Sequence, residues 1–205
     1  MSDLHILSTI KLERMEETDV FSEEMKEAQK AAMLKQWKVF KERMMRNQGN
    51  ILKQFDLFGN NAIHVATRSH PQLLKDLIEM VPVPQRWHAL CKQNGEGNTV
   101  LHEIVFSKMA KEMADVVFSF EDQLLPQEME DKRPLLEIRN KRGESPLFVA
   151  AMHGKLKILK HMANRVGSMQ NLRDHFRRSD KYNALHASII GQHFRMSFSS
   201  LLSCL

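Results

Sequence analysis

The sequence contains little of what disulfide-rich, redox-active or metal-binding proteins depend on. Only two of its 205 residues are cysteines, Cys91 and Cys204, and they do not form a CxxC pair. Two such cysteines cannot build a disulfide framework or a cysteine-rich zinc site, so these classes are excluded and a reducing compartment is expected. Glycine (8) and proline (6) are too few, and show no period, for a collagen-like or low-complexity chain.

Long apolar runs are also missing. The longest segment without Asp, Glu, Lys or Arg is 182–194, and asparagine, glutamine, serine and histidine interrupt it. A membrane-spanning helix needs about 20 mostly apolar residues, and the first residues lack the basic start and apolar stretch of a signal peptide. We therefore expect a cytoplasmic chain. Because 42% of its residues are hydrophobic, it can bury a core of its own.

Acidic charge is scarce in the last part of the chain. The net charge of +5 is divided as +1 over residues 1–55, −5 over 56–130 and +9 over 131–205. Such a basic third could contact an acidic protein, anionic lipid or nucleic acid, or form a solvated surface. Its densest stretch, 173–181, holds one aromatic residue, Phe176, and two aspartates, which is too little stacking surface for nucleic-acid binding. We expect no nucleic-acid partner.

What the chain does contain is a pattern repeated four times. The pattern occurs in segments 59–66, 97–104, 143–150 and 181–188. Each segment contains a short polar residue, an apolar residue two positions later, and His or Phe directly after that. The equivalent positions His64, His102, Phe148 and His186 are 38, 46 and 38 residues apart, so each interval is a period of roughly 33 residues with an insertion. The pattern resembles the ankyrin repeat, whose signature is G-x-T-P-L-H-x-A-A-x-x-G. This resemblance implies an all-α solenoid of helix-turn-helix units with short β-hairpin fingers.

The residues of this pattern suit a turn followed by a short helix. Glycine adopts positive φ without steric cost, and short polar side chains accept hydrogen bonds from the first N–H groups of a helix. Proline is tolerated at the first helical position, and glycine ends helices. These rules predict left-handed turn residues at Gly59, Gly97 and Gly143, N-caps at Asn61, Thr99, Ser145 and Asn183, a first helical residue at Pro146 and a C-cap at Gly154.

A second helix is expected after each short one. Apolar residues recur with helical spacing over 71–81, 109–120 and 156–162, and the stripes include Leu73, Leu74, Leu77, Ile78, Met109, Met113, Val117, Phe120, Ile158, Leu159 and Met162. The methionines are interpreted as core filler, with a methionine-rich recognition groove as the alternative. Segment 24–48 is interpreted as a partial capping repeat, in which Lys35 stands where glycine is expected and Val39, Phe40 and Met44 face the core.

This organisation predicts one repeat domain over residues 22–205 after a mobile N-terminal tail, 1–21, which has no periodicity. The partial repeat covers about 22–55, and the repeats cover about 56–93, 94–139, 140–177 and 178–205, the last one incomplete. The final helix would bury Phe198, Leu201 and Leu202 with no polar cap beyond it. We therefore expect self-association through this unsealed end.

Three segments, 94–103, 135–147 and 185–194, go beyond the generic repeat. They resemble the plant ankyrin-repeat proteins of the accelerated-cell-death type. That family implies cytosolic repeats followed by a membrane-embedded domain that opens with Pro-Gly-Gly. No Pro-Gly-Gly occurs in this sequence, and the ending after Phe194 is interpreted as a truncated or alternatively spliced product or a gene-model error. Membrane anchoring is therefore not carried over.

Catalytic and metal-binding motifs do not emerge. Equivalent histidines lie in successive layers of a solenoid, so His64, His102 and His186 are expected to hydrogen-bond the neighbouring loop rather than share a metal. His102-Glu103 begins like a zincin motif, but Phe106 stands where the second histidine is needed. Nucleophile-elbow, P-loop and dinucleotide-binding fingerprints are also missing. We expect a protein that is not an enzyme and that binds no metal or cofactor.

The resemblance implies that a protein partner binds the concave surface formed by the fingers and the short helices. By motif position, the exposed finger residues are Phe58, Asn60, Glu96, Asn98, Lys141, Arg142, Glu144, Lys181 and Tyr182. Aromatic residues combine large contact area with low entropy cost, so Phe58 and Tyr182 are the expected hot spots, unless Phe58 folds back over its own turn. The predicted function is an interaction scaffold in plant stress or defence signalling. The alternative is a membrane-peripheral regulator that contacts anionic lipid weakly through the basic third.

Overall fold

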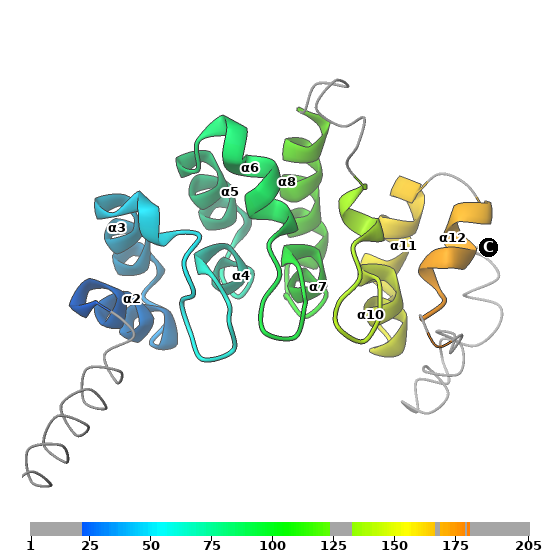
Figure 1. The fold of residues 1–205 in the computed structure, drawn as a ribbon, viewed down its shortest axis with the longest axis horizontal. Coiled ribbons are helices and arrows are strands. Elements are labelled where there is room, and N and C mark those ends of the chain that lie inside the picture. The colour runs from blue at the N-terminus through cyan, green and yellow to red at the C-terminus, as the bar shows by residue number, and fades with distance from the viewer. Residues whose placement is uncertain (1–21, 124–132, 167–168, 179, 181–205) are drawn as a thin grey trace, which may run out of the picture.

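A computed structural model describes the chain over residues 22–123, 133–166, 169–178 and 180. These residues form helices joined by turns, with no β-strand among them (Figure 1). The all-α class is therefore confirmed. The tail 1–21 and the last predicted repeat pattern, 181–188 with Asn183 and His186, lie outside the described residues.

The helices come in pairs, each a shorter one followed by a longer one in all but the first pair. The pairs are α2 (Glu23–Met33) with α3 (Trp37–Arg46), α4 (Ala62–Ala66) with α5 (Pro71–Met80), α7 (Val100–Ile104) with α8 (Ala110–Asp122), and α10 (Pro146–Met152) with α11 (Leu156–Val166). Helices α6 (Val83–Cys91) and α12 (Met169–His175) and the 3₁₀ turns η1 (Gln48–Asn50) and η2 (Leu135–Glu137) lie between or after them.

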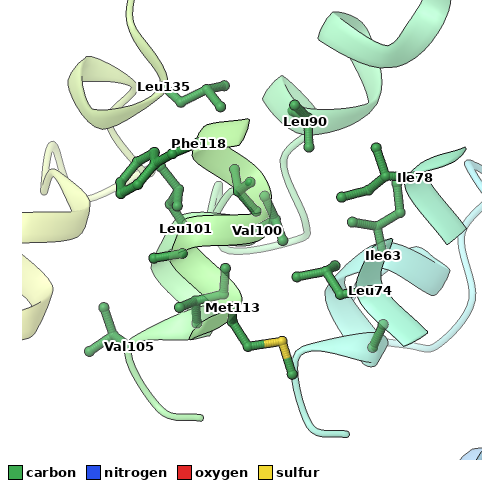
Figure 2. Close-up of a cluster of buried hydrophobic side chains, with 14 of the residues drawn as sticks. Ile63, Leu74, Ile78, Leu90, Val100, Leu101, Val105, Met113, Phe118 and Leu135 are labelled. Carbon is green, nitrogen blue, oxygen red and sulfur yellow. The ribbon is translucent and has the colours of Figure 1, made fainter. Parts of the chain in front are cut away.

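Successive pairs pack side by side in chain order (Figure 1). The shorter helices α4, α7 and α10 contact one another in sequence, and so do the longer helices α3, α5, α8 and α11. One core therefore runs through the whole stack. Figure 2 shows part of it, with Ile63, Leu74 and Ile78 of one pair facing Val100 and Met113 of the next.

The short helices begin where the sequence predicts. Asn61 Oδ1 accepts a hydrogen bond from His64 N at 3.0 Å, and Ser145 Oγ accepts one from Phe148 N at 3.1 Å. Thr99 is the N-cap of α7, and Pro146 is the first residue of α10. These contacts satisfy N–H groups that have no partner inside the helix.

The longer helices bury most of the expected stripe. Leu73, Leu74, Leu77 and Ile78 of α5, Met113, Val117 and Phe120 of α8, and Ile158, Leu159 and Met162 of α11 are all buried. Met109 was expected in the core and is 39% exposed, because it is the N-cap of α8 and precedes the helical face. Phe118, which the stripe omitted, is buried instead.

The first pair, α2 and α3, buries two of the three side chains of α3 that were expected to face the core. Phe40 and Met44 are buried, and the Phe40 ring meets Phe55 edge to face at 5.4 Å. Val39 was also expected to face the core, but it is 37% exposed. Lys35 adopts φ +56°, close to the +65° of Gly154. A lysine therefore occupies the left-handed position that ends α2.

Helices α6 and α12 were not predicted. Val83 and Pro84 begin α6 directly after Pro82, although the expected apolar stripe ended at residue 81 and no helix was predicted to follow it. Proline in the first turn lacks only an N–H that has no helical partner, so it can begin a helix as well as end one.

Within the ranges that the structure describes, no helix is both long and apolar enough to cross a bilayer.

Candidate functional site

Three turns, residues 56–60, 94–98 and 140–144, precede the short helices and stand next to one another (Figure 1). Each turn is built around the side chain of its first residue: Asp56, Asn94 or Asn140. One side-chain oxygen accepts hydrogen bonds of 3.0 Å from the backbone N–H groups of the third and fifth residues of the turn. The turns are therefore closed by their own side chains.

The β-hairpin form expected for these turns is not the one observed. In the second turn Asn94 N donates to Asn98 O at 2.9 Å, and Gly97 N donates to Asn94 O at 2.9 Å. Glu96 N and Asn98 N donate to the Asn94 side chain, and Gly95 N donates to Phe58 O of the first turn, so no further rung of a two-stranded ladder forms within the turn. The same arrangement closes the turn from Asn140 to Glu144.

The turn glycines have the predicted left-handed conformation. Gly59, Gly97 and Gly143 have φ values of +73°, +78° and +75°. At Gly97 a second constraint acts, because an added Cβ would lie 2.5 Å from the backbone nitrogen of Lys141 in the next turn. Glycine is thus required here both by the conformation and by the approach of the neighbouring turn.

Direct hydrogen bonds join each turn to the next. Backbone bonds run from Gly95 N to Phe58 O at 2.8 Å and from Lys141 N to Glu96 O at 3.0 Å. Beneath them, Asn94 Nδ2 donates to Asn60 Oδ1 at 2.9 Å and Asn140 Nδ2 donates to Asn98 Oδ1 at 3.0 Å. We refer to Asn60, Asn94, Asn98 and Asn140 as the amide ladder. Its hydrogen bonds hold each turn in a fixed position relative to the next turn.

Gln93 and Arg139, the residues just before the second and third turns, add a second set of links. Gln93 Nε2 donates to Gly97 O at 2.7 Å and to Arg139 O at 2.8 Å. Arg139 Nη1 donates to Gly143 O at 2.7 Å and to Arg177 O at 2.5 Å. Each side chain therefore closes its own turn and reaches the next layer.

His64 and His102 fasten the helices to the neighbouring turns, as expected of this position. Their Nδ1 atoms accept from the cap N–H groups, Asn61 N at 3.3 Å and Thr99 N at 3.1 Å. Their Nε2 atoms donate to Asn98 O at 3.1 Å and to Glu144 O at 3.0 Å. An imidazole that accepts at one nitrogen and donates at the other is neutral. Burial is the main cause that lowers the pKa of His64, and it lowers the pKa of His102 to about 4.

The predicted contact residues divide into exposed and buried ones. Phe58 is 72% exposed and does not fold back over its turn, and Glu96, Lys141 and Arg142 are exposed as well. Asn60 and Glu144 are only 3% and 2% exposed, so their prediction as surface contacts is wrong. Asn98 is half-buried in the amide ladder. Lys181 and Tyr182 lie outside the described residues.

The reason for the two buried residues is their place as the fifth residue of a turn. Asn60 accepts from Asn94, and Glu144 accepts from Asn140 Nδ2 at 3.0 Å with Arg178 Nη1 at 3.7 Å from its other oxygen. Sequence analysis missed the first turn residues Asp56, Asn94 and Asn140. Their spacing of 38 and 46 residues, the same as that of the histidines, is the signal that could have revealed them.

The surface made by the turns carries an apolar tip beside charged ones. Leu57, 88% exposed, and Phe58 form the first tip. Across the second and third turns, Arg142 Nη2 lies 3.9 Å from Glu96 Oε2, and Lys141 Nζ donates to Gly95 O at 2.5 Å. Among the residues that the structure covers, no group of three His, Cys, Asp or Glu side chains could hold a metal ion.

This chain was also compared with known proteins. A scan against protein-family models gave no match, and a search of curated proteins gave none either. The function of the turns is therefore inferred from their geometry and from the sequence pattern.

Proposed function

We propose that this chain is a stack of ankyrin-type repeats and acts as a non-catalytic scaffold for protein–protein interaction. Its partner binds across the turns 56–60, 94–98 and 140–144 and the short helices that follow them. The sequence resemblance to plant proteins of the accelerated-cell-death type supports a role in stress or defence signalling.

One observation carries this proposal: the turns are ordered before any partner arrives. Backbone bonds and the amide ladder join them, and their tips remain exposed. A surface that is already rigid loses little conformational entropy on binding. The turns therefore provide a preformed array of contacts rather than three separate loops.

Phe58 is the expected centre of the contact. A large aromatic side chain that is 72% exposed on a fixed turn offers apolar area without the cost of ordering the backbone. Glu96 lies in the turn next to that of Phe58, and Arg142 lies in the turn after it. These two residues can therefore supply charge at the edge of the same surface.

The test uses a protein captured by pull-down with the full chain, followed by binding measurements on purified variants. Phe58→Ala should weaken the complex about tenfold or more, as expected for a hot spot, and Arg142→Ala should weaken it by a smaller factor. Lys75→Ala on α5 is the control, because Lys75 is exposed on a longer helix away from the turns. If Phe58→Ala and Arg142→Ala bind like the wild type while Lys75→Ala disrupts the complex, the assignment of the surface is wrong.

A further inference from the structure

A second surface lies at the opposite ends of the short helices, away from the turns. Where α7 is followed by α8 and α10 by α11, the two connections enclose a groove of about 480 Å³. Four of its lining residues are lysines: Lys108 and Lys155 from the two connections, and Lys111 and Lys157 from the first turns of α8 and α11. Glu112 is the acidic residue that lines it.

The positive charge of this groove outweighs the negative charge that lines it, since four lysines stand against Glu112. None of the four lysines forms an ion pair within the described ranges. Two other acidic residues of α8 do not line the groove and are paired: Asp115 with His161 at 2.6 Å, and Asp122 with Arg165. The lysines are exposed, so they are available to a ligand from solution.

Two neighbouring helix pairs contribute equally to this cluster. The connection between α4 and α5, residues 67–70, contains one permanent cation, Arg68, whereas Lys35 lies between α2 and α3 and Lys38 lies in the first turn of α3. At the groove, two adjacent pairs each supply one lysine from the connection and one from the helical turn after it, so four positive charges line one concave surface. Clustered charge in a concave site attracts and retains oppositely charged ligands.

The floor of the groove is apolar. Val105 and Ile158 are buried beneath it, and Ala110 and Leu156 are half-buried at its surface. An ion that carries only charge would leave this floor unused. A peptide that places an apolar side chain between carboxylates would use both the floor and the lysines.

We propose that this groove binds an acidic segment of a protein partner, with an apolar side chain on the Leu156 floor and flanking carboxylates at the four lysines. The site is separate from the turns, so it goes beyond the scaffold function proposed above. A failure of either proposal leaves the other standing.

The experiment measures binding of a fluorescein-labelled peptide, Gly-Glu-Glu-Leu-Glu-Glu-Leu-Glu-Glu, to the full chain by fluorescence anisotropy. The groove variant combines Lys111→Glu with Lys157→Glu. The matched control combines Lys38→Glu with Lys53→Glu, which changes the net charge equally at exposed positions in the first part of the chain, outside the groove. Thermal unfolding followed by circular dichroism checks that both variants are folded.

We expect the groove variant to bind the peptide about tenfold or more weakly, and the control to stay within about twofold, because charge interactions act mainly within a Debye length. Replacing both leucines of the peptide by serine should also weaken binding. Equal losses in the two variants, unchanged binding of the serine peptide, or no binding of the leucine peptide would overturn the proposal. Binding of phosphatidylserine vesicles that the groove variant alone abolishes, with no peptide binding, would assign the groove to a membrane instead.

Discussion

Acidification should destabilise this protein through His102. Its side chain is fully buried, Thr99 N donates to its Nδ1, and its Nε2 donates to Glu144 O. Protonation of Nδ1 would place a second donor against the Thr99 N–H and leave a charge without solvent. Burial therefore lowers the pKa of His102 to about 4, from an ordinary value of 6.5.

The size and sign of the effect follow from this difference. Between about pH 6.5 and pH 4 the unfolded chain binds a proton at His102 and the folded chain does not, so the free energy of unfolding falls as the pH falls. The contribution is fully present above pH 6.5 and is lost as the pH approaches 4. A pKa difference of this size corresponds to about 3 kcal/mol at 1.36 kcal/mol for each tenfold change in proton affinity.

Urea unfolding followed by circular dichroism at several pH values measures this loss. His102→Gln is the reference, because glutamine can accept from the cap N–H and donate to Glu144 O without titrating in this range. Burial also lowers the pKa values of His64 and His175, so both proteins should lose some stability in acid. At about pH 4.5 the wild type should have lost roughly 2–3 kcal/mol more than His102→Gln.

Two outcomes would contradict the reasoning. One is the same pH dependence for the wild type and His102→Gln, which would mean that His102 does not titrate differently in the folded state. The other is a wild-type stability that rises as the pH falls below 6.5. At about pH 7.5, His102→Ala should cost about 1–3 kcal/mol, since it leaves the buried Thr99 N–H without its acceptor and removes one of the two hydrogen bonds that Glu144 O accepts.

Two further predictions concern backbone conformation, and thermal or urea unfolding measures both. Gly97→Ala should destabilise the fold by about 2–4 kcal/mol, because it combines a left-handed φ with a Cβ clash against the next turn. Gly49→Ala is the control and should cost under about 1 kcal/mol, since its Cβ would meet its nearest atom at 3.4 Å. Equal losses of stability in the two variants would contradict the argument. Lys35→Gly should stabilise the fold by about 1 kcal/mol by relieving the left-handed lysine, and a loss of stability would show that the lysine side chain contributes more than its conformation costs.

Local rules were sufficient for much of this fold. Asn61 and Ser145 cap their helices as predicted, and the three turn glycines have positive φ. Such features depend on a few neighbouring atoms, so residue type and spacing decide them. The buried stripe of α5 was predictable for a similar reason, since a helix that packs on one side repeats its apolar residues at helical spacing.

Features that depend on neighbouring layers were harder to predict. Asn60 and Glu144 were assigned to the surface by their position in the motif, yet both are buried. Asn60 bonds to Asn94 in the next turn, and Glu144 lies beside Arg178, which comes much later in the chain. Helix α6 was missed because Pro82 and Pro84 are equally compatible with the end and the start of a helix. In both cases the deciding contacts lie between segments, where sequence spacing gives little information.

The direct bonding between turns has a consequence for how this chain can change in evolution. The second and third turns are separated by 46 residues and the first and second by 38, yet the amide bonds between them are alike, 3.0 Å and 2.9 Å. Alignment of the layers is thus independent of the length of chain that connects them. Segments can be lengthened between a long helix and the next turn without shifting any layer, so new recognition loops can be inserted there while the scaffold keeps its geometry.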